Sequence, residues 1–218
     1  MQKIDYKKEF KQLYTASANE VVLVQVPEMY YLMIEGAGDP NTALAAKEAI
    51  ETLFPLAYAL KFKVKKELAM DYSVMPLEGL WWADDMSKFS IDKKDNWRWI
   101  YMIFQPAIIT EDFYKQILSE IARNKHLPAI SKVRFETLDE GLSAQVLHVG
   151  PFSDEGKTLS KLHDFIKEKG YKIDGTVKKH HEIYLSDYRK TNTEKLKTII
   201  RQPVFKSIDL CSYSDRQS

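Results

Sequence analysis

Cysteine is almost absent from this sequence of 218 residues, and so are long hydrophobic runs. The single cysteine, Cys211, rules out an intrachain disulfide or a zinc centre made of several cysteines. No segment approaches the roughly 20 consecutive apolar residues that a membrane-spanning helix needs. The first residues, MQKIDYKKEF, carry charges without a hydrophobic stretch behind them. We therefore expect a cytoplasmic protein that does not act in a membrane.

An excess of charge of one sign is also missing, because 32 lysines and arginines face 31 aspartates and glutamates. Such a balance gives no general positive surface for phosphate backbones, so nucleic acid is not an expected partner. Several catalytic motifs are absent too: G-x-S-x-G, the Walker sequence and G-x-G-x-x-G. Their absence argues against a serine hydrolase of that type, a phosphate-loop enzyme and a dinucleotide-binding domain.

Aromatic residues are plentiful and unevenly placed. The chain holds 12 tyrosines, 10 phenylalanines and 4 tryptophans, and all the tryptophans fall between Trp81 and Trp99. With 44% hydrophobic and 29% charged residues, the chain can bury a core as one large or two small domains. The tryptophan cluster therefore calls for a local explanation.

The first half of the chain reads as strands and helices in a recognisable order. Val21 to Val26 and Met29 to Glu35 predict two strands, joined as a hairpin at Pro27. Apolar residues then recur at steps of three and four from Ala43 to Val64, which predicts a helix. Pro55 is expected to bend or end that helix.

Two further strands and a second helix complete this half. Tyr72 to Trp82 and Trp97 to Gln105 predict strands, joined by a charged loop. Thr110 is placed to cap a helix, with acidic residues in its first turn and Arg123 near its end.

The second half repeats this order. Ala144 to Val149 predicts a strand, and an apolar helix face follows that ends at Gly170. His181 to Leu185 and Thr198 to Val204 predict the next two strands. As in the first half, the last strand ends in Gln-Pro. These ordered echoes predict a βαββ unit used twice.

The predicted fold class is α+β, with duplicated βαββ units related by pseudo-twofold symmetry. Its antiparallel sheet carries helices on one face and a ligand groove on the other. We expect residues 1–206 to form a single domain of two repeats, about 21–125 and 133–206, followed by a tail at 207–218. Two unrelated domains are the alternative, but Leu127-Pro128 does not have the composition of a flexible linker.

The strand around Trp99 carries an aromatic stripe. Alternation places Trp97, Trp99 and Tyr101 on one face of the strand. Most such stripes belong to a hydrophobic core. Here the opposite face already supplies apolar side chains for helix packing, so the stripe is interpreted as a stacking surface for a flat ligand. The residues assigned to the helix-packing face are Ile100, Met102 and Phe104.

A second candidate lies in the strand around Glu182, where alternation places His180, Glu182 and Tyr184 on one face. A solvated strand face is the simpler explanation. However, the opposite face is apolar, and a carboxylate in an apolar groove suits a general base or a counter-ion for a cation. His180 and His181 point in opposite directions, so no metal site is expected. Glu78 is a candidate second acid.

Six segments resemble those of one protein family, and the resemblance covers nearly the whole chain from about Tyr30 to Val204. They are Pro76–Trp82, Trp97–Trp99, Glu140–Gly141, Gln145–Phe152, His180–Asp187 and Lys197–Val204. Taken together they are similar to the free-standing branch of the GyrI-like (gyrase-inhibitor-like) small-molecule-binding family. The resemblance implies the duplicated βαββ fold, and it matches Glu182 to the family's central glutamate in the H-E-I-Y-L segment.

In drug-sensing regulators of this family, that glutamate faces lipophilic cations among aromatic rings. This chain shows no helix-turn-helix region, so a direct regulatory role is not expected. An interaction with gyrase is a weaker expectation from the resemblance.

The resemblance also implies an enzyme, because some free-standing members hydrolyse the cyclopropane ring of DNA-alkylating natural products and so protect the cell from genotoxins and antibiotics. Glu182 would then deprotonate a water, and Tyr184 or Tyr101 would donate a hydrogen bond to the developing phenolate. No metal or organic cofactor is implied. The alternative is a non-catalytic protein that sequesters lipophilic or cationic drugs. The expected ligand-binding residues are Trp81, Trp97, Trp99, Glu78 and His180.

Overall fold

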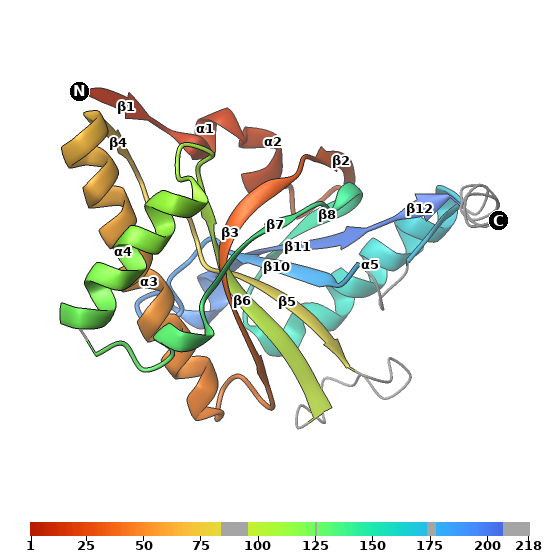
Figure 1. Ribbon diagram of the computed structural model, residues 1–218. Helices are drawn as coiled ribbons and strands as arrows, with labels where there is room; N and C mark the ends of the chain where they lie inside the picture. The colour runs from red at the N-terminus through yellow and green to blue at the C-terminus, as the bar shows by residue number, and fades with distance from the viewer. Residues whose placement is uncertain (84–95, 125, 174–177, 207–218) are drawn as a thin grey trace, which may run out of the picture. The chain divides into compact units, whose positions relative to one another are not determined.

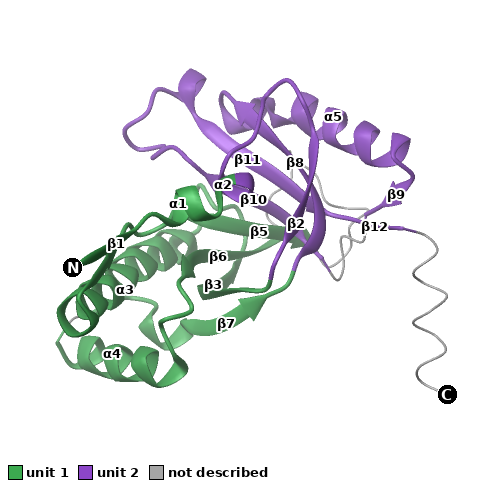
Figure 2. Cartoon of the chain, turned by 90° about the horizontal axis from the view of Figure 1, so that it is seen from above, with its two compact units in different colours: residues 1–11, 28–139 green, residues 12–27, 140–218 purple. Residues whose placement is uncertain are grey.

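The computed structural model describes residues 1–83, 96–124, 126–173 and 178–206 (Figure 1). The predicted tail at 207–218, with Cys211, lies outside these residues, as does most of the charged loop after Trp82. No helix in the described part of the chain is long and apolar enough to cross a membrane. The chain divides into two compact units, residues 1–11 with 28–139 and residues 12–27 with 140–218 (Figure 2).

Unit 1 is built on a four-stranded antiparallel sheet with the order β5-β6-β3-β7. Two long helices, α3 (Leu44–Leu68) and α4 (Glu111–Asn124), pack against each other, and α3 contacts β3 and β6. A short parallel pair, β1 (Gln2–Ile4) with β4 (Met70–Tyr72), completes the strands. The sheet strands are β3 (Met29–Ala37), β5 (Glu78–Ala83), β6 (Trp97–Gln105) and β7 (Arg134–Leu138).

The helices of unit 1 confirm one sequence expectation and correct another. Thr110 caps α4, because its Oγ1 accepts a hydrogen bond from the Phe113 backbone N–H at 3.2 Å. The alternative that Pro55 ends the helix is wrong, because α3 continues to Leu68. A proline inside a helix removes one backbone hydrogen bond. Here Leu53 and Leu56 on either side are fully buried, and this burial offsets the loss.

Unit 2 carries a matching sheet with the order β2-β8-β11-β10. The apolar face of α5 (Glu155–Glu168) covers it, and Gly170 ends this segment with a positive φ of 74°. The strands are β2 (Val22–Val26), β8 (Gly141–Val149), β10 (His180–Tyr184) and β11 (Lys197–Pro203). Shorter elements are α1 (Tyr6–Glu9), α2 (Lys11–Tyr14), β9 (Tyr171–Lys172), β12 (Phe205–Lys206), and the 3-10 turns η3 (Ile130–Lys132), η4 (Phe152–Asp154) and η5 (Thr193–Lys195).

The two units share one chain order, which confirms the α+β fold class and the duplicated βαββ topology. The elements β3-α3-β5-β6 of unit 1 correspond to β8-α5-β10-β11 of unit 2, and the strands hold the same positions in each sheet. The predicted hairpin of β2 and β3 is wrong. β2 pairs with β8 instead, and β7, which precedes β8 in the chain, pairs with β3. Each unit therefore takes its fourth strand from the segment that leads into the other repeat.

The register of unit 1 shows which sheet face the helices cover. Phe135 of β7 lies opposite Leu32 of β3, and its ring stacks on Tyr114 of α4 at 5.1 Å. Leu32 therefore marks the helix-covered face. Ile34 and Gly36 follow Leu32 at two-residue intervals along β3, so they share this face. Both are paired with the aromatic stripe, since Gly36 lies opposite Trp99 and Ile34 opposite Tyr101.

The assignment of the helix-packing face to Ile100, Met102 and Phe104 is therefore wrong. Alternation separates two faces but does not say which one a helix covers, and the aromatic stripe is the covered one. The other face is not open along its whole length, because the Phe104 ring contacts Tyr6 and Phe10 of the N-terminal segment at 5.5 Å each.

Gly36 is required where the fully buried Trp99 indole packs against β3. A Cβ built at Gly36 would lie 2.2 Å from two carbons of the Trp99 ring. We predict that Gly36→Ala lowers the free energy of unfolding by at least about 1–3 kcal/mol, because a buried indole has little freedom to move aside. Chemical denaturation measures this change.

Gly156→Ala is the matched control, because a Cβ there meets nothing within 4 Å and the residue lies in α5. Alanine is the better helix former, so this variant should be unchanged or more stable by up to about 1 kcal/mol. Equal stability of the two variants would contradict the packing role given to Gly36.

Candidate functional site

Three of the predicted site residues meet on β10, and we call His180, Glu182 and Tyr184 the Glu182 cluster. The Tyr184 hydroxyl donates a hydrogen bond to Glu182 Oε2 at 2.7 Å. His180 Nε2 lies 3.4 Å from the other carboxylate oxygen, Oε1. Glu182 keeps only 8% of its surface exposed. The sequence prediction that these side chains share a face is confirmed by this geometry.

The Glu182 cluster lies on the helix-covered face of its sheet. Glu182 is opposite Ile200, which is opposite Val146, and these two belong to the apolar core beneath α5 with Leu162 and Ile166. From the sequence, the apolar face opposite Glu182, which carries Ile183, was expected to face the core. Ile183 is indeed fully buried, but it points to the other face. The carboxylate therefore sits beside apolar side chains rather than on a solvated strand face.

Two residues outside β10 extend this cluster. The Phe152 ring meets the Tyr184 ring edge-on at 5.8 Å. Burial lowers the pKa of the His163 imidazole on α5, and repulsion from His180 lowers it further. His163 was not among the site residues predicted from the sequence. Its position in the sequence is nevertheless informative, because helical spacing places residues 159, 163 and 166 on one face of the helix.

The contact between Tyr184 and Glu182 determines which acceptor receives the hydrogen bond of the tyrosine hydroxyl. A phenol has a single O–H donor, and here that donor is directed to the carboxylate. In this arrangement Tyr184 orients Glu182. Its expected role as donor to a ligand oxygen remains a prediction, as does the same role for Tyr101.

A buried ionic network backs the Glu182 cluster from the opposite face of the sheet. His181 Nδ1 lies 3.0 Å from each oxygen of Glu140, and Arg201 Nη1 donates to Glu140 Oε2 at 3.0 Å. Arg201 also donates from Nε to Gln145 Oε1 at 3.1 Å and from Nη2 to the Leu13 carbonyl at 2.7 Å. The network thus links β8, β10, β11 and the segment before β2.

The charges of this network hold Glu140 ionised despite its burial. Burial alone would raise the pKa of the Glu140 carboxyl, but attraction to His181 and Arg201 outweighs it and lowers the pKa to about 2. Because the folded pKa lies below the ordinary value of 4.5, the stabilising contribution is present above that pH and is lost as pH falls towards 2.

We predict that Glu140→Gln destabilises the protein by about 3–5 kcal/mol at neutral pH, because it leaves the Arg201 charge buried without a counter-charge. The difference from the natural protein should shrink as the pH is lowered, since Glu140 itself becomes protonated there. Urea unfolding at several pH values measures both effects. Glu194→Gln, at an exposed glutamate, should change neither. A difference in the free energy of unfolding between Glu140→Gln and the natural protein that stays constant as the pH falls from 4.5 towards 2 would contradict the account.

The predicted aromatic residues of unit 1 also come together, and we call Trp81, Trp97, Trp99 and Tyr101 the tryptophan cluster. Trp81 meets Trp97 and Tyr101 edge-on, with ring centroids 5.5 and 5.7 Å apart, and Trp99 lies 4.9 Å from Tyr101. Trp99 is fully buried, and the others keep 3–9% of their surface exposed. Glu78 is not part of this cluster: it is fully buried, opposite Met102 on the other sheet face.

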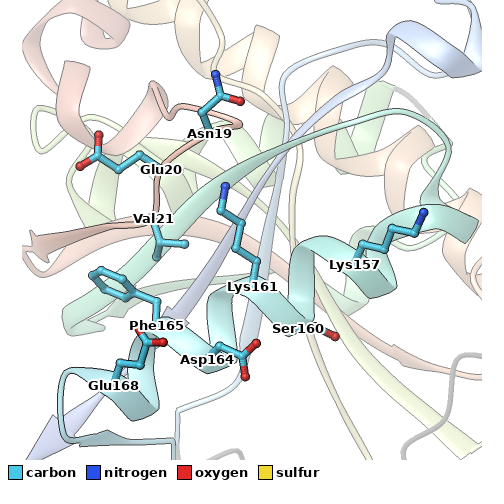
Figure 3. Close-up of a pocket in the computed structure, with 9 residues that line it drawn as sticks. All are labelled: Asn19, Glu20, Val21, Lys157, Ser160, Lys161, Asp164, Phe165 and Glu168. Carbon is cyan, nitrogen blue, oxygen red and sulfur yellow. The ribbon is translucent and has the colours of Figure 1, made fainter.

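A separate open depression of about 660 Å³ lies between α5 and the segment before β2 in unit 2 (Figure 3). Charged side chains of both signs line it, including Glu20, Lys157, Asp164 and Glu168. Lys161 reaches across to the Ala18 carbonyl at 3.0 Å. None of the residues predicted from the sequence lines this depression. Its mixed, solvated lining does not form a defined recognition pattern.

Metal ligation was not expected, and among the described residues no group of three or more histidine, cysteine, aspartate or glutamate side chains is placed to hold a metal ion.

Comparison with known proteins places these features in a family. The family model of the GyrI-like small molecule binding domain matches residues 19–204. None of the curated proteins compared matches the sequence.

Solved structures give further similarity. An uncharacterised conserved protein from Listeria innocua is 38% identical, with a TM-score of 0.85, and the match covers 93% of this chain and 100% of that one. A protein of the same organism described as a hydrolase encoded by lin2189 is 37% identical, with a TM-score of 0.84 and coverage of 94% and 100%. The EcmrR C-terminal domain shares the fold at 13% identity, a TM-score of 0.51 and coverage of 86% and 98%. The match over most of its length shows that this chain belongs to the GyrI-like small-molecule-binding family.

Proposed function

We propose that this protein binds flat, hydrophobic aromatic molecules and hydrolyses the cyclopropane ring of DNA-alkylating natural products, which would protect the cell from genotoxins. The observation that carries the proposal is the Glu182 cluster. A carboxylate with 8% exposure lies beside an apolar core and is oriented by the Tyr184 hydroxyl at 2.7 Å. A desolvated, oriented carboxylate is what a general base requires.

Two further findings support an enzyme of this type. Relatives at 36% and 37% identity, both from Listeria innocua, are described as hydrolases. The tryptophan cluster offers large, rigid aromatic surfaces, which suit planar rings. We assign the binding of those rings to Trp81, Trp97, Trp99 and Tyr101. His180, which lies beside Glu182, is assigned to the substrate-binding residues of unit 2.

The proposed reaction needs little machinery because the cyclopropane is strained. The oxygen of a water attacks the methylene carbon of a cyclopropane fused to a dienone, while Glu182 accepts the water's proton. The carbon–carbon bond that breaks gives its electron pair to the ring system, which becomes a phenolate. The phenolate then gains a proton from solvent, and Glu182 releases its own. One molecule of water is added overall, and no cofactor takes part.

A non-catalytic role in drug sequestration is the second candidate, and the same carboxylate favours it. A buried negative charge bordered by the Tyr184 and Phe152 rings suits a lipophilic cation, which would interact with both the charge and the ring faces. In this case Glu182 acts as a counter-ion and not as a base.

Glu182→Gln separates the two roles, because glutamine keeps the shape of the side chain but cannot accept the proton. If Glu182 is the base, turnover of a cyclopropane-fused dienone should fall by about 10²–10⁴-fold, while binding of a neutral planar dye stays nearly unchanged. If Glu182 is a counter-ion, affinity for a cationic planar dye should fall selectively, because a desolvated charge pair is lost. Turnover and both affinities are measured on the same preparation.

Glu194→Gln serves as the control for removing a negative charge, since Glu194 is exposed in η5. Its turnover and affinities should match those of the natural protein. Full turnover in Glu182→Gln would remove Glu182 from the role of base, and Glu78 would be tested next.

A further inference from the structure

Among the described residues, two buried hydrogen-bond donors in the tryptophan cluster have no acceptor. The Nε1–H groups of Trp81 and Trp99 are both buried, and within the described part of the chain neither forms a hydrogen bond. The two residues lie directly opposite each other on β5 and β6. Their side chains share the helix-covered face of the sheet.

Leaving these donors unsatisfied is costly. A buried polar group without a partner costs about 1–3 kcal/mol, and buried indole N–H groups in proteins usually have one. Phenylalanine would fill much of the same apolar space without a donor. The presence of two such donors side by side is explained if a bound ligand supplies the hydrogen-bond acceptor.

The surrounding residues hold both rings in place before any ligand binds. Trp99 packs on Gly36, where a Cβ would fall 2.2 Å from its ring, and on Tyr101 at 4.9 Å. Trp81 is held edge-on between Trp97 and Tyr101. The most exposed members of the cluster are Trp97 and Tyr101, which keep 9% and 7% of their surface exposed. Fixed donors of this kind bind an acceptor without first losing side-chain entropy.

We propose that Trp81 and Trp99 form a specificity site for a hydrogen-bond acceptor, and that the planar ligands of this protein carry a ring-bound oxygen, carbonyl or phenolate, that pairs with the indole N–H groups. Indole donates and does not accept, so the site favours a carbonyl over an amine or an unsubstituted ring. The inference rests on the proposed binding of planar ligands.

A matched pair of neutral probes tests the site: 9-fluorenone, which has a ring carbonyl, and fluorene, which lacks it. The natural protein should bind fluorenone more tightly by about 2- to 13-fold for each N–H used, the equivalent of about 0.5–1.5 kcal/mol per hydrogen bond. Trp81→Phe and Trp99→Phe keep an aromatic ring and should lose that preference, with fluorene affinity nearly unchanged. Trp82→Phe is the control, because Trp82 lies on the other sheet face opposite Arg98.

Nuclear magnetic resonance of the ¹⁵N-labelled indole groups gives a direct readout in the natural protein. The four tryptophans give four side-chain N–H signals. Fluorenone should move those of Trp81 and Trp99 downfield, as a new hydrogen bond requires, and fluorene should not. Spectra of Trp82→Phe and Trp97→Phe identify the two signals by elimination, so the test does not depend on the folding of the Trp81 and Trp99 variants.

The outcomes separate this inference from the proposed function. Loss of the fluorenone preference in the phenylalanine variants, or the selective downfield shift, supports it. Equal binding of both probes by the natural protein, or a preference that survives both substitutions without a shift, overturns the acceptor site and leaves planar-ligand binding standing. Failure of both probes to bind contradicts planar-ligand binding, and the acceptor site falls with it.

Discussion

Unit 2 depends on placing a buried carboxylate on each face of one short strand, β10, with Glu140 keeping 3% and Glu182 8% of its surface exposed. On one face of β10, His181 and Arg201 neutralise Glu140, and the guanidinium is satisfied by Gln145 and the Leu13 carbonyl. On the other face Glu182 contacts the Tyr184 hydroxyl and lies near His180. A network of several buried ionic contacts is rigid, whereas a carboxylate with fewer contacts keeps the capacity to take a proton or a cation. The stable face therefore supports the reactive one.

Unit 1 also buries polar groups, but it does so among aromatic and apolar side chains. Its sheet buries a row in which Trp81, Trp99 and Gly36 lie side by side on neighbouring strands, and only glycine leaves room for the Trp99 indole. The result is a packed aromatic cluster in which two buried indole donors have no acceptor within the described part of the chain. Both units thus place polar groups, the Glu182 carboxylate and the indole N–H donors, next to packed apolar side chains. This combination is typical of small-molecule sites and consistent with the GyrI-like family.

Local patterns in the sequence predicted much of this fold, and pairing choices account for the errors. Periodicity located the helices α3, α4 and α5 and most of the sheet strands, and the Thr110 cap and Gly170 marked helix ends. It missed β1 and β7, and the single strand expected from Tyr72 to Trp82 is wrong, because β4 ends at Tyr72 and β5 begins at Glu78. Adjacent strands usually pair, which suggested a β2–β3 hairpin, yet β2 pairs with β8 through contacts more than a hundred residues away in sequence. Alternation put Glu182 with Tyr184 and Trp97 with Trp99, but it did not show which face the helices cover. His163 and the ionic partners of Glu140 depend on tertiary contacts.

The central claim is that this member of the GyrI-like family adds water across a strained ring. The most direct measurement is the product mass after incubation of the protein with a cyclopropane-fused dienone in ¹⁸O-labelled water. The account predicts a single product heavier than the substrate by one labelled water, formed in amounts exceeding the protein. Unchanged substrate recovered from a tight complex, or a product without the label, would contradict it.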